Sequence, residues 1–316
     1  MVRSLWSAAT GMNAQQTNVD TIANNLANVN TTGYKAQVAQ FKSLLYQNLQ
    51  TPTTTANGDP KPTGSQVGLG VRTSSINNIF TQGAMLSSQS VSAVAIQGAG
   101  FFAIQGAGGE THYTRNGDFT WALSGNNSLM LTTSDGNAVL DTNGRPMVVD
   151  MNAIRAGYTT AFNSFLATWR ANNTNPDGTL KNPDLQEPTM ADLNTLSLVS
   201  SQIAIDAHGG VNYFFGGIDF PLNMHFGLYQ FANVGGLERI GSTLFRDTAA
   251  SGPAMNELTS VGLQRSQVAQ NYLEGSNVYV ADEMVNLIVA QRAYEMNSKA
   301  ITTSDEMMQT ANNLKR

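Results

Sequence analysis

Apolar residues recur every seven positions near the start of the chain. Leu5, Met12, Val19 and Leu26 form one row, and Ala8, Gln15, Ile22 and Val29 follow them by three residues. This is the a/d seam of a coiled coil, with one polar member at Gln15. The pattern predicts a helix that begins near Ser4 and is closed by a left-handed cap at Gly33.

The outer face of this helix is nearly uncharged. Before Lys35 it carries two charges, Arg3 and Asp20, and is otherwise rich in Asn, Gln, Ser, Thr and Ala. A solvated amphipathic helix usually has charges opposite its apolar stripe. The composition therefore favours a helix that packs on more than one side.

The other end of the chain has the same period. A second helix is predicted from Val278 to about Asn312. Its seven-residue row is Val280, Leu287, Tyr294, Ile301 and Met308, and its companion row is Met284, Gln291, Ser298 and Asp305. Two seamed helices at opposite ends predict an α+β fold, in which the terminal helices pair as a coiled coil and an antiparallel β-rich domain is inserted between them.

Composition shifts mark the expected domains. We expect an N-terminal coiled-coil helix and arm at 1–50, with 41–47 either a short helix or an extended arm, and a Pro/Gly-rich extended linker at 51–80. A β-rich outer domain follows at 81–245, because turn signals recur at 116–117, 124–125, 135–136 and 143–144. Within it an extra segment at about 151–230 contains helically spaced apolar residues, namely Ile154, Tyr158, Phe162, Phe165 and Trp169. Residues 246–316 form a return linker and the C-terminal helix.

Charge and cysteine content exclude several classes of protein. Of 316 residues 12% are charged, the net charge is −5, and basic residues are not clustered. This argues against a nucleic-acid partner and against binding to an anionic membrane surface. The absence of cysteine excludes disulfides and thiolate zinc sites. The first residues lack the pattern of a secretory signal, so no cleaved signal peptide is expected.

Catalytic motifs are also missing. No Gly-Lys pair occurs, and the histidines His112, His208 and His225 are isolated in sequence. Gly98-Ala99-Gly100 begins like a dinucleotide-binding motif, but a strand pattern follows it where a helix is required. We therefore expect no catalytic, cofactor-binding or metal-binding residues, and no enzymatic activity.

Four stretches together resemble the bacterial flagellar rod and hook protein family. They are residues 23–35 (ANNLANVNTTGYK), residues 94–102 (VAIQGAGFF) with 113–119 (YTRNGDF), residues 274–278 (EGSNV), and residues 283–285 (EMV) with 291–301 (QRAYEMNSKAI). The resemblance covers about 1–150 and 231–316. Residues 44–47, the Pro/Gly-rich stretch after them, and 236–241 look most like the distal rod members. Residues 151–230 depart from that pattern, so proximal rod and hook members are alternatives.

The resemblance implies an axial structural protein that is exported unfolded by the flagellar type III apparatus, without a cleaved signal, to the periplasmic rod of the basal body. It implies a helical tube in which terminal helices form the inner layer and β-domains face outward. Its partners would be copies of itself, other rod proteins, the hook protein and the surrounding ring bushing. The expected assembly interface is Leu5, Met12, Val19, Ile22, Asn24, Asn25, Leu26, Asn28, Val29, Val280, Met284, Leu287, Tyr294, Ile301 and Met308.

Two alternatives lie outside the family. One is a β-rich binding module on a coiled-coil stalk. The other is a carbohydrate-active enzyme with an aromatic sugar platform, formed by Trp169, Tyr213, Phe214 and Phe215.

Overall fold

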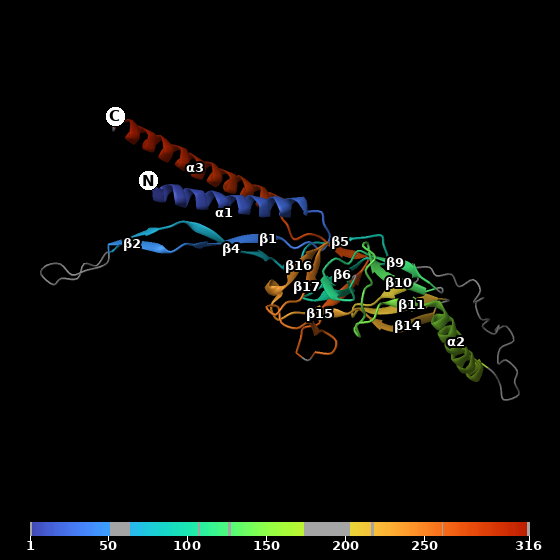
Figure 1. Ribbon diagram of the computed structural model, residues 1–316. Helices are drawn as coiled ribbons and strands as arrows, with labels where there is room; N and C mark the ends of the chain where they lie inside the picture. Colours follow the sequence, from blue (N-terminus) through green and yellow to red (C-terminus); the bar gives the residue numbers. More distant parts are fainter. Residues whose placement is uncertain are drawn as a thin grey trace. The chain divides into compact units, whose positions relative to one another are not determined.

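The computed structural model describes residues 2–50, 64–106, 108–125, 128–173, 203–215, 218–260 and 262–314. The fold is α+β, with a helix at each end and a β-rich middle (Figure 1). The chain divides into unit 1, Met1–Gly83 with Ser276–Arg316, and unit 2, Ala84–Gly275. No helix in the described ranges is long and apolar enough to cross a membrane.

Unit 1 is built on the two terminal helices, α1 (Val2–Ala27) and α3 (Val280–Asn313). Both predicted helices are thereby confirmed, and they lie side by side and run in opposite directions (Figure 1). The left-handed cap of the first helix predicted at Gly33 is wrong. The helix ends at Ala27, and Gly33 adopts its positive φ of 68° in a later turn. Asn28 donates from Nδ2 to the Asn24 carbonyl at 2.8 Å, and such Asn side chains compete with helical backbone hydrogen bonds.

A β-hairpin follows α1 and packs on it. Its strands are β1 (Gln37–Ser43), β2 (Tyr46–Gln50), β3 (Ser65–Gly68) and β4 (Val71–Asn78), paired antiparallel as β1 with β4 and β2 with β3. The segment 41–47 is thus extended. The linker expected at 51–80 is in part strand, and residues 51–63 lie outside the described residues. Gly70 has a φ of 113°, and a Cβ there would lie 2.2 Å from Thr10 Oγ1, so glycine allows the close approach to α1.

Unit 2 contains antiparallel sheets. The six-stranded sheet has the order β16 (Glu238–Gly241), β17 (Leu244–Arg246), β8 (Thr111–Thr114), β7 (Phe101–Gln105), β15 (Leu228–Gln230), β18 (Met255–Asn256). Two three-stranded sheets are β11 (Val148–Asp150), β10 (Ser128–Thr133), β9 (Phe119–Ser124), and β12 (Ile203–Ile205), β13 (Gly210–Phe215), β14 (Ile218–His225). Two pairs are β19 (Gln267–Gln270) with β6 (Val94–Gln97), and β20 (Tyr272–Glu274) with β5 (Met85–Ser87). A 3-10 turn, η3 (Val234–Gly236), precedes β16.

Two features of unit 2 bear on the expected domains. The predicted turns at Gly125, Gly136 and Gly144 are confirmed, because each glycine has a positive φ. The return linker expected from 246 is wrong up to Gly275. Residues there form β18, β19 and β20, which pair with β15, β6 and β5, respectively, of the same unit. These strands are short and polar, so they carry little periodic signal.

The described parts of the extra segment fold with unit 2. Helix α2 (Met151–Asn173) confirms the helix predicted there, and its Ile154 is buried in the same core as Phe102 and Tyr213. Leu166 packs against that core, and Trp169 is half-buried. The side chains of Tyr158, Phe162 and Phe165 lie outside the described residues, as does the strand-like run 196–199.

Candidate assembly surface

Small and polar side chains lie where α1 and α3 meet. A Cβ added to Gly11 would lie 2.8 Å from Asn297 Nδ2, and Asn25 donates to Glu283 Oε1 at 3.1 Å. Ala290 and Ser304 are buried on the same row of α3. Four residues of α3 at seven-residue spacing thus face α1, namely Glu283, Ala290, Asn297 and Ser304. Sequence reasoning missed this row because its members are small or polar, and the seven-residue spacing was the available signal.

The predicted interface residues on α1 differ in exposure. Ile22 and Asn25 are buried, and Asn24 is exposed. Those that are half-buried are Leu5, Met12, Val19, Leu26, Asn28 and Val29. Val29 packs against the small cluster formed by Tyr34, Ala36 and Val278. Part of this face is therefore used within the chain, and part of it is accessible to another molecule.

The predicted interface residues on α3 are more exposed. Leu287, Ile301 and Met308 are half-buried, whereas Val280, Tyr294 and Met284 are 41%, 40% and 51% exposed. Further apolar side chains on α3 are accessible, namely Val285, Ile288, Val289 and Met296. An unusually large share of the apolar surface of α3 thus lacks cover within the described chain.

Asn25 connects three parts of unit 1. Its Nδ2 donates to the Gln37 carbonyl at 2.8 Å and to Glu283, while its Oδ1 accepts from Gln37 N–H at 2.8 Å and from Tyr34 Oη at 3.2 Å. We call Asn25, Tyr34, Gln37 and Glu283 the polar joint. Burial raises the pKa of Glu283, against the opposing effect of the Asn25 hydrogen bond, and the negative charge of Asp282 raises it further. The joint ties the end of α1, the start of β1 and the start of α3 together.

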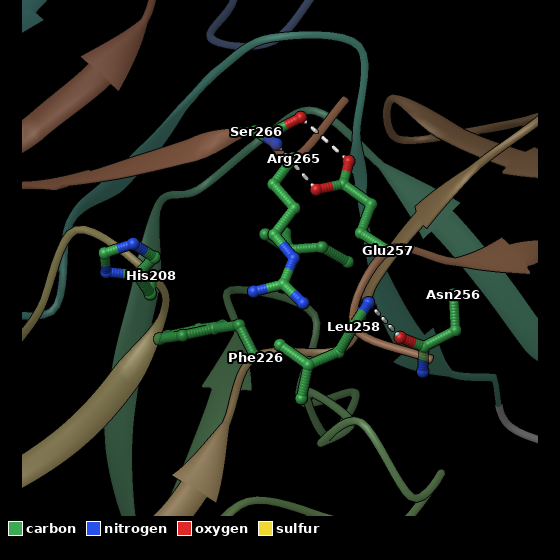
Figure 2. Close-up of a pocket in the computed structure, with 8 residues that line it drawn as sticks. His208, Phe226, Asn256, Glu257, Leu258, Arg265 and Ser266 are labelled. Carbon is green, nitrogen blue, oxygen red and sulfur yellow. Dashed lines mark hydrogen bonds between the residues drawn. The ribbon is translucent and has the colours of Figure 1, made fainter. Parts of the chain in front are cut away.

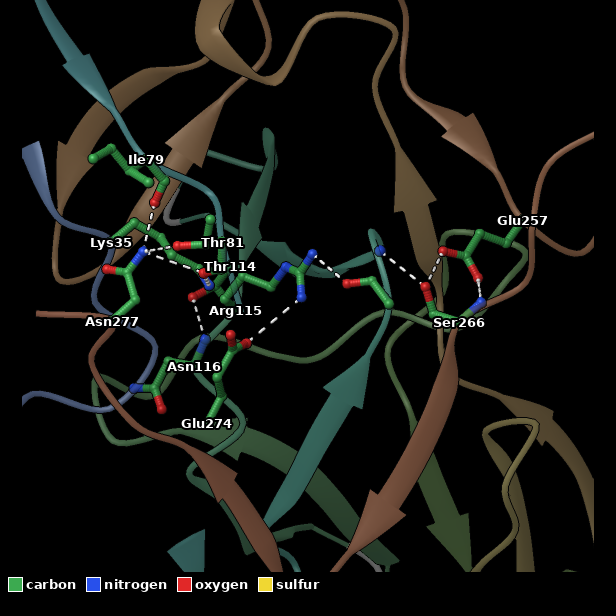
Figure 3. Close-up of polar contacts among 12 residues, drawn as sticks. Lys35, Ile79, Thr81, Thr114, Arg115, Asn116, Glu257, Ser266, Glu274 and Asn277 are labelled. Carbon is green, nitrogen blue, oxygen red and sulfur yellow. Dashed lines mark hydrogen bonds and ion pairs between the residues drawn. The ribbon is translucent and has the colours of Figure 1, made fainter. Parts of the chain in front are cut away.

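A second group of polar contacts crosses unit 1 nearby. Lys35 is fully buried and donates from Nζ to the Thr81 carbonyl at 2.8 Å. Asn277 donates to the Ile79 carbonyl at 2.8 Å and to Thr81 Oγ1 at 2.9 Å (Figure 3). It also accepts from Ala36 N–H at 2.7 Å. Segments from both ends of the chain thus depend on one another for their buried hydrogen bonds.

A small pocket in the described part of unit 2 does not form a catalytic site. It encloses about 20 Å³ and is lined in part by His208, Phe226, Glu257, Arg265 and Ser266 (Figure 2). That volume holds about one water. Glu257 is already engaged, because its carboxylate accepts from Ser266 N–H at 2.7 Å and Ser266 Oγ at 2.8 Å. No group of three or more metal-binding side chains occurs among the described residues.

A buried ion pair in unit 2 is structural. Arg115 NH1 lies 3.5 Å from Glu274 Oε2, and both side chains are buried (Figure 3). Arg115 also donates to the Gly98 carbonyl at 2.8 Å and stacks over the Phe101 ring at 4.8 Å. Burial lowers the pKa of Arg115, and the nearby Glu274 partly opposes that effect. This pair joins the loop after β8 to β20.

The alternative of an aromatic sugar platform is wrong, because Tyr213 is 1% exposed and lies in the core. Burial also raises the pKa of its hydroxyl. The side chains of Phe214 and Phe215 lie outside the described residues. With Tyr213 buried, the aromatic group cannot present one flat face to a sugar.

Three family models match the chain. Residues 5–35 match "Flagella basal body rod protein", residues 95–213 match "Flagellar hook protein FlgE/F/G D1 domain", and residues 269–314 match "Flagellar basal body rod FlgEFG protein C-terminal". These matches fall on α1, on the β-rich middle and on α3 with the strands before it.

Several relatives similar to the full chain are flagellar basal-body rod proteins FlgG. The protein of Borreliella burgdorferi is 38% identical over 100% of both chains, and that of Agrobacterium fabrum is 38% identical over 97% of each. The protein of Bacillus subtilis is 33% identical over 100% of both.

Proposed function

The chain belongs to the flagellar basal-body rod protein family, and from this premise we propose that it polymerises with copies of itself into the tubular distal rod, which transmits motor torque to the hook. It is a structural protein and not an enzyme. Its place in the cell is the flagellar basal body rod.

The observation that carries this proposal is the uncovered apolar surface of α3. Val285, Val289 and Met296 are 60%, 62% and 66% exposed on a single helix. Monomeric soluble proteins rarely expose large contiguous apolar patches, and such patches mark interaction sites. A neighbouring copy of the chain would remove these side chains from water and stabilise the assembled state.

The terminal helices would then form a coiled-coil layer. In this layer α1 and α3 of one subunit pack along their seven-residue rows, and neighbouring subunits cover the outward residues among those predicted, such as Leu5, Met12, Val280 and Met284. The Asn and Gln side chains of α1 would exchange water for hydrogen bonds between subunits. The low charge of α1 supports this, because few charged groups would need to be desolvated.

In the tube, unit 1 would line the channel and unit 2 would lie at larger radius, together with the segment from about 153 to 225. The partners would be other rod proteins, the hook protein and the ring bushing around the rod. Delivery to the periplasmic rod would use the flagellar type III export apparatus.

Electron cryomicroscopy of the assembled protein tests the proposal. We expect a hollow tube with the terminal helices in its inner layer and α2 outside them. A chain that remains a monomer with both terminal helices formed, under conditions where other rod proteins polymerise, would instead support the β-rich binding module on a coiled-coil stalk. A tube whose inner layer is made by unit 2 would also contradict the proposal.

A further inference from the structure

Trp6 is an exposed aromatic side chain in the first turns of α1. It is 66% exposed, and Arg3 is also exposed three residues earlier on an adjacent part of the helix. Tryptophan is enriched among the residues that dominate binding energy at protein interfaces. Its large apolar ring favours burial, and its indole N–H requires an acceptor once it is buried.

The same unit contains a groove with matching chemistry. The groove has a volume of about 330 Å³ and is lined by Gln16, Val19, Gln291, Tyr294 and Glu295. This is about ten times the ~30 Å³ share of one liquid water. Val19 and the Tyr294 ring offer apolar contact, while two amide oxygens and a carboxylate offer acceptors for an indole N–H.

Trp6 cannot fill the groove of its own chain. Within one helix, Gln16 and Val19 lie about 15 to 20 Å along the axis from Trp6. The contacts of Gly11 with Asn297 and of Asn25 with Glu283 fix the register of α3. In that register, residues 291–295 lie opposite the middle of α1 and away from Trp6. The side chain that fits the groove must come from another molecule.

The charges of Arg3 and Glu295 also favour a contact between two molecules. Arg3 is the only basic residue of α1, and the groove carries the carboxylate of Glu295. Glu295 is paired within its helix with Arg292 at 3.3 Å, but both side chains are mostly exposed, at 65% and 75%. Such an exposed pair is weak and exchanges readily. Glu295 is therefore available to a second arginine that approaches together with Trp6.

We propose that Trp6 of one subunit inserts into this groove on a neighbouring copy of the chain, where Arg3 pairs with Glu295. The inference rests on the polymerisation proposed above and specifies one contact within it. Trp6 and the groove belong to different surfaces of the subunit, so the contact is heterologous. Such a contact can repeat from subunit to subunit without closing into a ring. It shifts neighbouring subunits by about 15 Å along the terminal helices.

Disulfide trapping tests the contact, and the chain suits it because it has no cysteine of its own. In the variant Trp6→Cys/Gln291→Cys, oxidation of assembled rods should give a ladder of covalent multimers on a non-reducing gel. Rods of each single variant should run as monomers on the same gel. The matched control Trp6→Cys/Met296→Cys should give no ladder, since Met296 is exposed but does not line the groove.

Rods that form from the Gln291 double variant without a ladder would overturn the inference, as would an equal ladder from the Met296 control. If the double variant does not assemble, small amounts of the two single variants are mixed into wild-type subunits, and a covalent dimer containing one of each is expected. Rods that incorporate both variants without that dimer would overturn it. Absence of rods from the wild-type chain would instead refute the proposed function.

A charge exchange gives an independent measurement. Arg3→Glu and Glu295→Arg should each reduce the number of rods several-fold, and the double variant Arg3→Glu/Glu295→Arg should restore most of it. Failure of the double variant to improve on either single variant would contradict the pairing of these two residues.

Discussion

Two carboxylates in this protein, those of Glu274 and Glu283, lie in different electrostatic environments. The carboxylate of Glu274 is fully buried against Arg115, whereas Glu283 is half-buried in the polar joint beside an uncharged Asn25. A buried charge with a counter-ion is costly to break. A carboxylate without one instead favours its protonated form.

Replacing Arg115 tests the buried pair. Arg115→Met should lower the free energy of unfolding of unit 2 by about 3–5 kcal/mol, because Glu274 would be left as an uncompensated buried charge. Urea unfolding followed by tryptophan fluorescence measures it. The double variant Arg115→Met/Glu274→Met should recover much of the loss. The control is Arg246→Met, which breaks an exposed pair with Glu238. An equal loss in the control would contradict this account.

The raised pKa of Glu283 predicts a pH dependence. Between the ordinary carboxyl pKa of 4.5 and its raised value, the folded state binds more protons than the unfolded state. The free energy of unfolding of unit 1 therefore falls as pH rises through this window. Melting of assembled rods, followed by circular dichroism from mildly acidic to neutral pH, should show the fall. Glu283→Gln should flatten it, and Glu306→Gln, at an exposed position of the same helix, should not.

At the scale of elements, the hairpin of β16 and β17 departs from the usual turn chemistry. Gly241 pairs with Leu244, so the loop is Ser242-Thr243, with positive φ values of 46° and 59°. A two-residue loop of this kind favours Asn-Gly, because both central residues need positive φ. For a β-branched residue such as Thr243 that conformation is strained.

Thr243→Gly should therefore stabilise unit 2 by about 1 kcal/mol, the cost of the left-handed conformation less the greater freedom of glycine in the unfolded chain. The backbone carbonyl of residue 243 still accepts from Thr114 Oγ1. Thermal unfolding measures the gain. Thr243→Ala keeps the strain and serves as the control, so an equal gain there would show that strain is not the cause.

Helix α1 carries the prediction on assembly. Leu26 is half-buried on the predicted seam, and Leu26→Asp should block rod formation because burial of an unpaired carboxylate costs several kcal/mol. Rods are counted by electron microscopy in cells that lack their own rod protein. Asn13→Asp introduces the same charge on the exposed face of α1 and should assemble. Normal rods from Leu26→Asp would contradict the prediction.

For the whole molecule, the two units have different grounds for stability. Unit 2 has a large apolar core in which Phe102 packs edge-on against Phe119, with ring centroids 5.1 Å apart. In unit 1, α3 leaves much of its apolar surface exposed, and α1 contains many weak helix formers. Isolated helices of this kind are marginal in water. Unit 2 should fold alone, while unit 1 depends on neighbours.

We therefore expect both terminal helices to be unfolded in the free subunit and to fold on assembly. Hydrogen exchange on dilute monomer should show little protection of residues 5–29 and 280–308, alongside strong protection of strands such as β7 and β10. The same residues should become protected in assembled rods. Strong protection of the terminal helices in the monomer would show that they fold alone, and the assembly-coupled mechanism would be wrong.

The sequence by itself determined the terminal helices, the glycine turns of unit 2 and the family, because periodicity and turn chemistry are local properties. The tertiary structure decided which faces of the helices meet. The row of α3 that faces α1 is Glu283, Ala290, Asn297 and Ser304. None of these is a large apolar residue, so hydrophobicity in the sequence does not mark the row. Its small members permit close approach of the two helices. The tertiary structure also decided the hydrogen-bond partners of Asn25 and Lys35. Hydrogen bonds between distant segments depend on how those segments are aligned, which no local sequence pattern specifies.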